Sequence, residues 1–328
     1  MIRAGFVSSS PQWHWERQFP GSRPVWDGVE FVFSGSFDNC DIVFVFDAVP
    51  DDLSGRLSAP RSMFIASEPA SVKTYNHDFL AQFDRVLTTD RSTRHPHVIF
   101  GQLGLPWHVG VWDNTGAMLS EPMTLDDFEV FQPTKTKSVS VVTSNKAFTE
   151  GHRARLEFVR RLKAYFGDEI DLFGRNINNF GDKLEVLSEY RYHIAIENSS
   201  YDDYWTEKLS DPFLTNTYPI YYGCANISQY FDLRAVSPFD LADEDGAIAT
   251  IKRLIESDEA ERVGEHMREA KRKVLREHNL FAILAKAAST VWSDTTGRRH
   301  SLFTEREHVK NKVRFKLKKM ISAARNKL

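Results

Sequence analysis

Four polar residues with complementary chemistry lie at the end of one expected strand and at the start of the next expected helix. Glu197 and Asn198 follow the apolar run "RYHIAI", and Glu207 and Lys208 open the segment "EKLSDPFLT". In an open parallel sheet, ligands bind beyond the carboxyl ends of the strands, where helix N-termini offer unpaired N–H groups to anions. A lysine in the first helical turn opposes the helix dipole unless a ligand phosphate or a partner carboxylate compensates.

Two hypotheses explain this cluster. In the first, Lys208 binds a diphosphate, and Glu197 and Glu207 accept hydrogen bonds from sugar or ribose hydroxyls. Asn198 can both donate and accept in such a site. In the second, the four residues form a cap and salt-bridge cluster that only organises a strand-to-helix loop, because Glu and Lys pairs are common on helices.

The first hundred residues have the pattern of an α/β domain. Short runs rich in Val, Ile and Phe recur with polar segments between them, which indicates strands covered on both faces. These runs are "IRAGFV", "VEFVF", "DIVFVFD", "SMFIAS" and "RVLTTD". The segment "EPASVKTYNHDFLAQF" is predicted to be a helix, because its large apolar residues repeat at helical spacing. These residues are Val72, Tyr75, Phe79 and Phe83.

The alternation restarts after a polar, proline-flanked stretch. The predicted strands of the second half are "SVSVVTS", "DEIDLFG", "RYHIAIE" and "YPIYYG", and the predicted helices are "EGHRARLEFVRRLKAYFG", "KLEVLSEY" and "YWTEKLSDPFLT". Two successive α/β units imply two Rossmann-like domains that face a cleft. We expect an N-terminal domain over residues 1–120, a linker over 121–137, a C-terminal domain over 138–300 and a basic tail over 301–328.

The composition excludes several classes of protein. The 42 Lys and Arg residues against 45 Asp and Glu residues give a net charge of −3, which argues against a nucleic-acid binder with a basic surface. The two cysteines, Cys40 and Cys224, are too few for a disulfide framework or a thiolate metal site. Neither a signal peptide nor a membrane span is expected from the apolar runs. We therefore expect a soluble, cytoplasmic protein.

The segment "YRYHIAIENSSYDDYWTEKLSDPFLTNTYPIYYG", residues 190 to 223, resembles the signature of the α-1,3/4-fucosyltransferases, glycosyltransferase family 10. The family pattern is Phe-Glu-Asn, a Tyr six residues beyond the Asn, then Thr-Glu-Lys and a strand that ends in Pro, two hydrophobic residues and Gly. Upstream, "VVTSNKAFTEGHRARLEFVRRL" and "DLFGR" are similar to further elements of the family in the same order. The resemblance covers about residues 138 to 232.

The resemblance implies a GT-B fold in which the C-terminal domain holds a nucleotide sugar, typically GDP-fucose, without an essential metal or other cofactor. An arginine should neutralise the diphosphate, and either Arg155 or Arg153 fits that position, while a solvent-facing helix arginine is the alternative for each. The donor-binding residues implied in this way are Arg155, Arg153, Glu197, Asn198, Tyr204, Glu207 and Lys208. The motif "DED" at 243 to 245 has the form of a metal site but is predicted to start a helix, where acids are favoured.

Glu68 is the predicted catalytic base. An inverting transfer needs a group that takes the proton of the acceptor hydroxyl as the anomeric carbon is attacked. Glu68 directly follows a predicted strand and precedes Pro69, and its Ser-Glu-Pro resembles a Glu-Ser-Pro of the family. The alternative is an acid that only favours the start of the following helix.

The predicted function is therefore the transfer of fucose from GDP-fucose to a hydroxyl of a glycan acceptor, on a surface polysaccharide or a lipid-linked oligosaccharide. Two alternatives remain: a transferase for another nucleotide sugar, and a protein that binds a nucleotide sugar or glycan without catalysis. Residues 306–328 combine apolar residues at helical spacing with many Lys and Arg, which predicts a helix on the anionic inner face of the cell membrane. A solvated helix or a disordered basic tail is the alternative for that segment.

Overall fold

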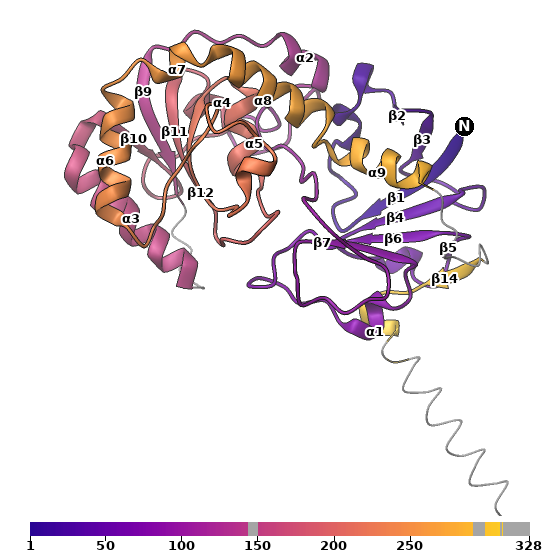
Figure 1. Ribbon diagram of the computed structural model, residues 1–328. Helices are drawn as coiled ribbons and strands as arrows, with labels where there is room; N and C mark the ends of the chain where they lie inside the picture. The colour runs from indigo at the N-terminus through magenta and orange to yellow at the C-terminus, as the bar shows by residue number, and fades with distance from the viewer. Residues whose placement is uncertain (144–149, 291–298, 309, 311–328) are drawn as a thin grey trace, which may run out of the picture. The chain divides into compact units, whose positions relative to one another are not determined.

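The structure is a computed structural model that describes residues 1–143, 150–290, 299–308 and 310. The contacts group the chain into two compact units, which are described separately here (Figure 1). Unit 1 comprises Met1–Trp13, Pro24–Leu103 and the described residues from Leu284 onward. Unit 2 comprises His14–Arg23 and Gly104–Ile283.

Unit 1 is built on a seven-stranded sheet in the order β2-β3-β1-β4-β6-β7-β8. Every neighbouring pair is parallel except β2 with β3. The strands are β1 (Ile2–Ser8), β2 (Val25–Trp26), β3 (Val29–Val32), β4 (Ile42–Phe46), β6 (Ser62–Ile65), β7 (Arg85–Thr88) and β8 (Val98–Phe100). An antiparallel pair, β5 (Leu57–Ala59) and β14 (His300–Leu302), forms a small second sheet.

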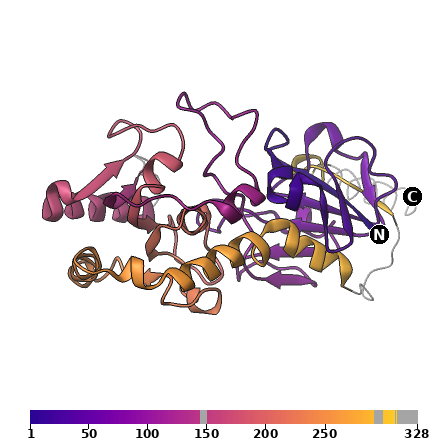
Figure 2. The same cartoon turned by 90° about the horizontal axis from the view of Figure 1, so that it is seen from above.

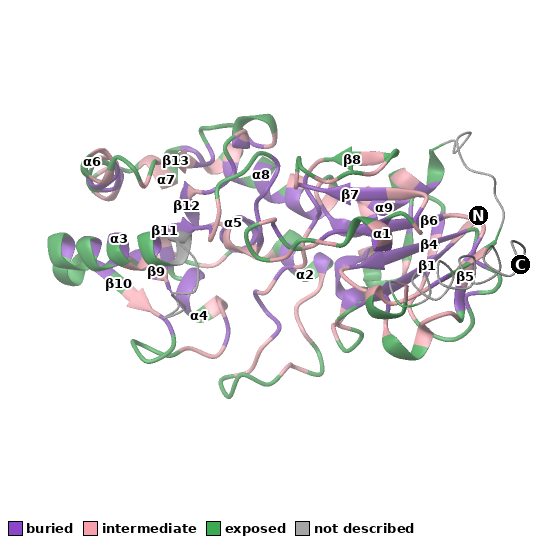
Figure 3. Cartoon of the chain, turned by 90° about the horizontal axis from the view of Figure 1, so that it is seen from below, coloured by how far each residue is buried: buried purple, intermediate pink, exposed green. Residues whose placement is uncertain are grey.

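The central strands of unit 1 are buried on both faces, as their continuous apolar runs predict. All five residues of β4 and all four of β6 are buried. Figure 3 shows β1, β4, β6 and β7 in the colour of buried residues. Because these strands are parallel, their carboxyl ends lie along one edge of the sheet, where loops that carry functional side chains can meet.

The helix predicted for "EPASVKTYNHDFLAQF" is wrong for most of its length. After Pro69 the chain makes a turn in which the Val72 N–H donates to the Pro69 carbonyl, 2.9 Å away. The helix α1 (His77–Leu80) begins only after Asn76, whose side chain accepts from the N–H groups of the next turn. An N-cap of this kind ends the preceding extended segment. Phe79 still packs into the core of the unit.

Unit 2 is built on a five-stranded, all-parallel sheet in the order β10-β9-β11-β12-β13. Its strands are β9 (Lys137–Val142), β10 (Ile170–Phe173), β11 (Tyr190–Ile196), β12 (Tyr218–Tyr222) and β13 (Ser237–Pro238). The first four of these strands were predicted from the sequence. The two parallel-sheet units confirm the predicted α/β class with two Rossmann-like domains, the domain content of a GT-B protein.

Further helices are α2 (Leu125–Val130), α3 (Glu150–Phe166), α4 (Leu184–Leu187), α5 (Glu207–Leu214), α6 (Glu244–Ile255), α7 (Glu259–Arg262), α8 (Gly264–Arg276) and α9 (Leu280–Ser289). Of these, α3, α4 and α5 were predicted from the sequence. Figure 2 shows α6, α7 and α8, in orange, one after another along one side of unit 2. The carboxylate of Asp243 accepts from the Gly246 N–H and caps α6, so the "DED" motif is a helix start, as predicted.

The stretch predicted as an irregular linker, 121–137, contains α2. Thr124 and Asp127 form a capping box, in which each side chain accepts from the other's backbone N–H. Leu125 and Phe128 are fully buried, so this short helix is anchored to unit 2.

The compact units also differ from the predicted domain boundaries. Arg17 lies in a segment expected in the N-terminal domain, but its guanidinium donates to the carbonyls of Met123, Trp107 and Val109, all in unit 2. Residues 300–302, which were expected in the C-terminal domain and the tail, join unit 1 through the pairing of β14 with β5. Long-range contacts of this kind cannot be read from local patterns.

The predicted tail helix lies almost entirely outside the described residues, which include only 306–308 and 310 of that segment. Among the residues that the structure describes, no helix is both long enough and apolar enough to cross a membrane.

Candidate functional site

Glu197 directly follows β11, and its carboxylate has no exposed surface (0%). Its Oε1 accepts from the Thr206 N–H at 2.8 Å, and the Thr206 hydroxyl lies 2.9 Å from both carboxylate oxygens. The Lys208 Nζ is 3.4 Å from Oε2. Glu197 therefore contacts the chain itself and ties the end of β11 to the start of α5.

Lys208 lies in the first turn of α5, for which Thr206 is the N-cap. The Lys208 Nζ is 3.1 Å from the Glu207 carboxylate, in addition to its contact with Glu197. Partner carboxylates therefore compensate this cation at the helix N-terminus, which is one of the two conditions that the sequence allowed. Its side chain keeps 25% of its surface exposed, so a ligand can still reach it.

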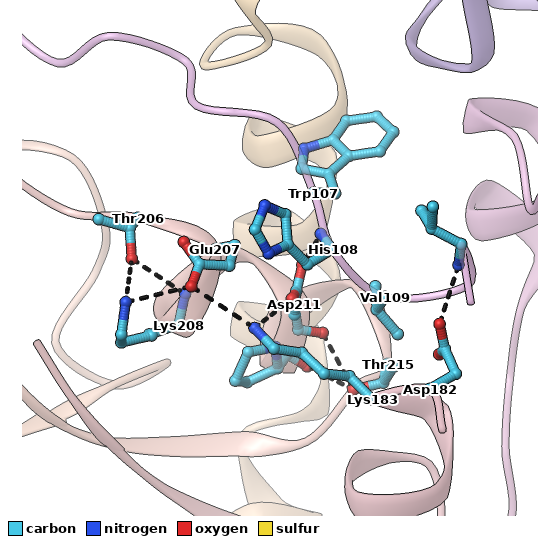
Figure 4. A network of polar contacts seen from close by, with 12 residues as sticks. Trp107, His108, Val109, Asp182, Lys183, Thr206, Glu207, Lys208, Asp211 and Thr215 are labelled. Atoms are coloured by element: carbon cyan, nitrogen blue, oxygen red, sulfur yellow. Dashed lines mark hydrogen bonds and ion pairs between the residues drawn. The ribbon is translucent and has the colours of Figure 1, made fainter. Parts of the chain in front are cut away.

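Lys183 also belongs to this network, although the sequence did not predict it there (Figure 4). Its Nζ is 3.8 Å from Glu207 and 2.7 Å from the buried carboxylate of Asp211. Asp211 also accepts from the backbone N–H of His108 at 3.1 Å. The charges alternate in sign along the series Glu197, Lys208, Glu207, Lys183 and Asp211.

Burial and charge act against each other on the pKa values in this network. Burial raises the pKa of Glu207, but the ammonium groups of Lys208 and Lys183 outweigh it and hold that pKa well below its usual value. Burial lowers the pKa of Lys208, but the carboxylates of Glu207 and Glu197 raise it above its usual value. Glu207 and Lys208 are therefore both ionised at neutral pH.

Arg155 joins the network from helix α3. Its side chain is buried, and its Nη1 donates to the Asn198 Oδ1 at 2.5 Å. Burial lowers the pKa of Arg155, and the nearby Glu197 carboxylate partly restores it. Arg153, the alternative candidate on the same helix, is exposed. The arginine that contacts Asn198 is therefore Arg155.

The loop between Asn198 and α5 is fixed by buried polar contacts. Asp203 adopts a left-handed backbone conformation, with φ of 64°, and is buried. Its carboxylate accepts from the Asn226 amide at 2.8 Å and from the Tyr230 hydroxyl at 2.5 Å. Tyr204 is buried beside it and contacts the ring of Tyr201 edge to face. These contacts fix the loop between β11 and α5.

Gly223, at the end of β12, leaves the space that Glu197 occupies. A Cβ at this position would lie 2.4 Å from the Glu197 Cγ and 2.4 Å from the Tyr221 hydroxyl. Such distances are far below van der Waals contact, so only glycine fits here. The glycine of the sequence motif therefore has a packing role in the site.

Glu68 belongs to unit 1, whereas the other seven predicted site residues belong to unit 2. It follows β6 and is exposed. Its backbone N–H donates to the Tyr75 hydroxyl at 3.4 Å. The structure therefore joins five predicted residues in one network, namely Arg155, Glu197, Asn198, Glu207 and Lys208, with Tyr204 in the adjoining loop.

Sequence reasoning missed Lys183 and Asp211. Asp211 could have been found, because it lies four residues after Glu207 on the same helix and therefore on the same face. Lys183 gives no such local signal. The carboxylate of its neighbour Asp182 accepts from the backbone N–H groups of residues 110–112, and this long-range contact fixes where the turn that carries Lys183 lies.

The site combines two ammonium groups and a guanidinium with carboxylates and an amide, at a strand-to-helix turn of a Rossmann-like unit. Such a set can bind an anion such as a diphosphate and can accept hydrogen bonds from hydroxyls. Among the described residues, no group of three or more His, Cys, Asp or Glu side chains is arranged to hold a metal ion. Fold and site together define an α/β protein with a charged network at the carboxyl ends of the strands of unit 2.

Residues 132–244 match the family model described as "Glycosyltransferase family 10 (fucosyltransferase) C-term". The matched segment includes residues 190 to 223, the motif whose sequence resembles the signature of this family. It also contains the charged side chains of the network, from Arg155 to Asp211.

Curated relatives carry names of the same kind. The chain is 34% identical over 89 residues to an alpha-(1,3)-fucosyltransferase of Helicobacter pylori, which covers 27% of this chain and 18% of that protein. It is 30% identical over 138 residues to a 3-galactosyl-N-acetylglucosaminide 4-alpha-L-fucosyltransferase of Homo sapiens, which covers 41% of this chain and 33% of that protein. The matched segments thus span a third or less of these relatives.

A solved structure described as "alpha1,3-Fucosyltransferase with GDP-fucose" aligns with 94% of this chain and 88% of its own chain, at 17% identity and a TM-score of 0.47.

Proposed function

We propose that this protein is a glycosyltransferase that moves fucose from GDP-fucose to a hydroxyl of a glycan acceptor, with inversion at the anomeric carbon. The observation that carries the proposal is the coincidence of the family segment with the charged network. The match to family 10 covers residues 132–244, and the charged side chains from Arg155 to Asp211 all lie inside it.

The cations of the proposed donor site are fixed by contacts within the protein. Arg155 and Lys208 would neutralise the diphosphate as the bond to the sugar breaks, which is where negative charge develops. The three donors of Lys208 already have acceptors in Thr206, Glu207 and Glu197. A diphosphate would therefore replace one of them, most readily the partly exposed Glu207, whose carboxylate could then accept from a hydroxyl of the donor.

In the proposed reaction the acceptor oxygen attacks the anomeric carbon of fucose, and the bond from that carbon to the diphosphate oxygen breaks. Glu68 takes the proton of the acceptor hydroxyl, and GDP leaves with the electron pair. A carboxylate that is exposed at the end of a parallel strand suits this role, because ligands bind beyond the carboxyl ends of such strands. The acceptor would be a glycan on a surface polysaccharide or a lipid.

A screen of nucleotide-sugar hydrolysis tests the proposal without a known acceptor. The full chain is incubated with GDP-fucose, GDP-mannose, UDP-galactose or CMP-sialic acid, and release of the nucleotide is measured. We expect slow release from GDP-fucose alone. Preferential cleavage of another sugar nucleotide would overturn the proposed donor. Tight binding of GDP-fucose with no cleavage and no transfer would instead support a binding protein.

A further inference from the structure

The Tyr75 hydroxyl links the Glu68 loop to the end of a neighbouring strand. It donates to the Asp47 Oδ1 at 2.6 Å and accepts from the Glu68 N–H at 3.4 Å. Asp47 directly follows β4, and Glu68 follows β6, the strand that pairs with β4 in the sheet. One hydroxyl therefore connects two adjacent strand ends at the edge of unit 1.

The position of this hydroxyl is fixed by the core. The Tyr75 ring packs edge to face against Phe64 of β6, with the ring centroids 5.1 Å apart. Phe64 has no exposed surface (0%). A tyrosine that stands on a buried ring has little rotamer freedom, so its hydroxyl gives the Glu68 loop a rigid contact.

Lys73 ties the same loop to the same strand end. Its Nζ is 2.8 Å from the Asp47 Oδ1 and 3.3 Å from the Asp47 carbonyl oxygen. Asp47 has a left-handed backbone with φ of 68°, which aims its side chain at the loop and which few residues other than Asn, Asp and Gly adopt readily. The loop from Glu68 to Tyr75 is thus held at its start and at its end.

Asp47 is itself poorly suited to accept a proton. Burial raises its pKa, but hydrogen bonds from Lys73 and Tyr75 outweigh burial and lower that pKa overall. The carboxylate is therefore ionised and occupied by its donors. The exposed Glu68 is the better candidate for a base at this edge.

We infer that Tyr75, anchored by Asp47, is a positioning residue that holds Glu68 for proton abstraction. This inference rests on the proposed function, in which Glu68 is the base. General-base catalysis depends on geometry to within a fraction of an ångström, and misplacement by about 1 Å can cost roughly 100-fold in rate. An exposed glutamate on a loop needs an external support of this kind.

The test is a double-mutant cycle with Tyr75→Phe and Glu68→Gln, read out as release of GDP from GDP-fucose with water as the acceptor. Phe keeps the ring on Phe64 and removes only the hydroxyl. We expect Tyr75→Phe to lower kcat by about 10-fold or more and to leave KM for GDP-fucose unchanged. In the Glu68→Gln background the same change should alter kcat by less than about twofold, because the residue that it positions is already inactive. Tyr165→Phe, on the surface of α3, is the matched control and should leave all constants unchanged.

Two results would overturn the inference while leaving the proposed base in place. One is an equal loss from Tyr75→Phe in both backgrounds, and the other is no loss at all. Full activity of Glu68→Gln would remove the base and this inference together, so the two failures are distinguishable. Asp47→Asn keeps an acceptor and tolerates the left-handed backbone, and we expect it to reproduce part of the Tyr75→Phe loss in kcat. Wild-type kcat for Asp47→Asn would contradict the anchoring role of that carboxylate.

Discussion

The donor-site edge of unit 2 and the Glu68 edge of unit 1 are both carboxyl ends of parallel strands, but they are assembled differently. In unit 2, Glu197, Thr206 and Lys208 are close neighbours in the sequence and satisfy one another. In unit 1, the side chains that meet come from loops after separate strands, as in the contact between Asp47 and Tyr75. A short sequence motif can therefore encode the first edge but not the second.

The two edges also differ in charge. The unit 2 network pairs three carboxylates with two ammonium groups and lies beside the Arg155 guanidinium, so its cations are ready to meet an anion. The unit 1 edge presents the exposed Glu68, whose backbone N–H donates to the Tyr75 hydroxyl. In the proposed function, unit 2 binds the donor and unit 1 supplies the proton acceptor. Substitutions at both edges test this assignment.

The largest effect is expected from Glu68→Gln. The amide keeps the shape and hydrogen bonding of the side chain but cannot take a proton, so kcat should fall by on the order of 100-fold or more. The affinity for GDP, measured by calorimetry, should be unchanged because Glu68 belongs to the other edge. Wild-type turnover would exclude Glu68 as the base. A parallel loss of GDP affinity would contradict the assignment of donor binding to unit 2.

Gly223→Ala should have the next largest effect, this time on unit 2. The added methyl group overlaps the Glu197 side chain and the Tyr221 hydroxyl, each 2.4 Å away. We expect a loss of about 2 to 3 kcal/mol in the free energy of unfolding, measured by denaturant titration, and weaker GDP binding. Gly101→Ala is the matched control, since a Cβ there would meet no atom within 4 Å. An equal stability of both variants would contradict the close approach of Glu197.

Lys208→Ala and Arg155→Ala should each weaken GDP binding roughly tenfold, or about 1.4 kcal/mol, the scale of a charge-assisted hydrogen bond to a phosphate. Calorimetry measures the loss, and a melting curve separates it from the destabilisation expected when Glu197 loses a partner. Arg160→Ala on the same helix as Arg155 is the control, because Arg160 pairs only with the exposed Glu157 in the described contacts. Unchanged GDP binding by both site variants would place the diphosphate elsewhere.

The smallest effect concerns pH. His278 contacts the rings of Trp205, Tyr230 and Phe231, and burial lowers its pKa to about 4, against 6.5 for an ordinary histidine. Between these values the unfolded chain binds a proton that the folded chain does not, so stability falls as the pH falls from 6.5 toward 4.

His278→Phe removes this proton uptake. Between about pH 7 and pH 6 the wild type should lose about 0.7 kcal/mol more stability than the variant, measured by denaturant titration at each pH. Identical pH slopes for the two proteins would show that His278 does not titrate in this range.

The sequence predicted most strands and the donor motif because these depend on local pattern. The apolar run of β4 and the order from Glu197 to Lys208 need no tertiary information. Lys183 could not be predicted as a partner of Glu207 and Asp211, because the turn that carries it is fixed by distant backbone groups. The predicted helix around Val72 failed for a related reason, since the Asn76 cap and the turn after Pro69 override helical periodicity.

The central claim is that unit 2 holds a guanosine diphosphate sugar, and comparative calorimetry of the full chain with GDP, UDP and CMP tests it most directly. We predict that GDP binds at least roughly tenfold more tightly than UDP, a difference of about 1.4 kcal/mol, and that Lys208→Ala removes most of the GDP affinity. Binding of UDP that equals or exceeds binding of GDP would contradict the claim.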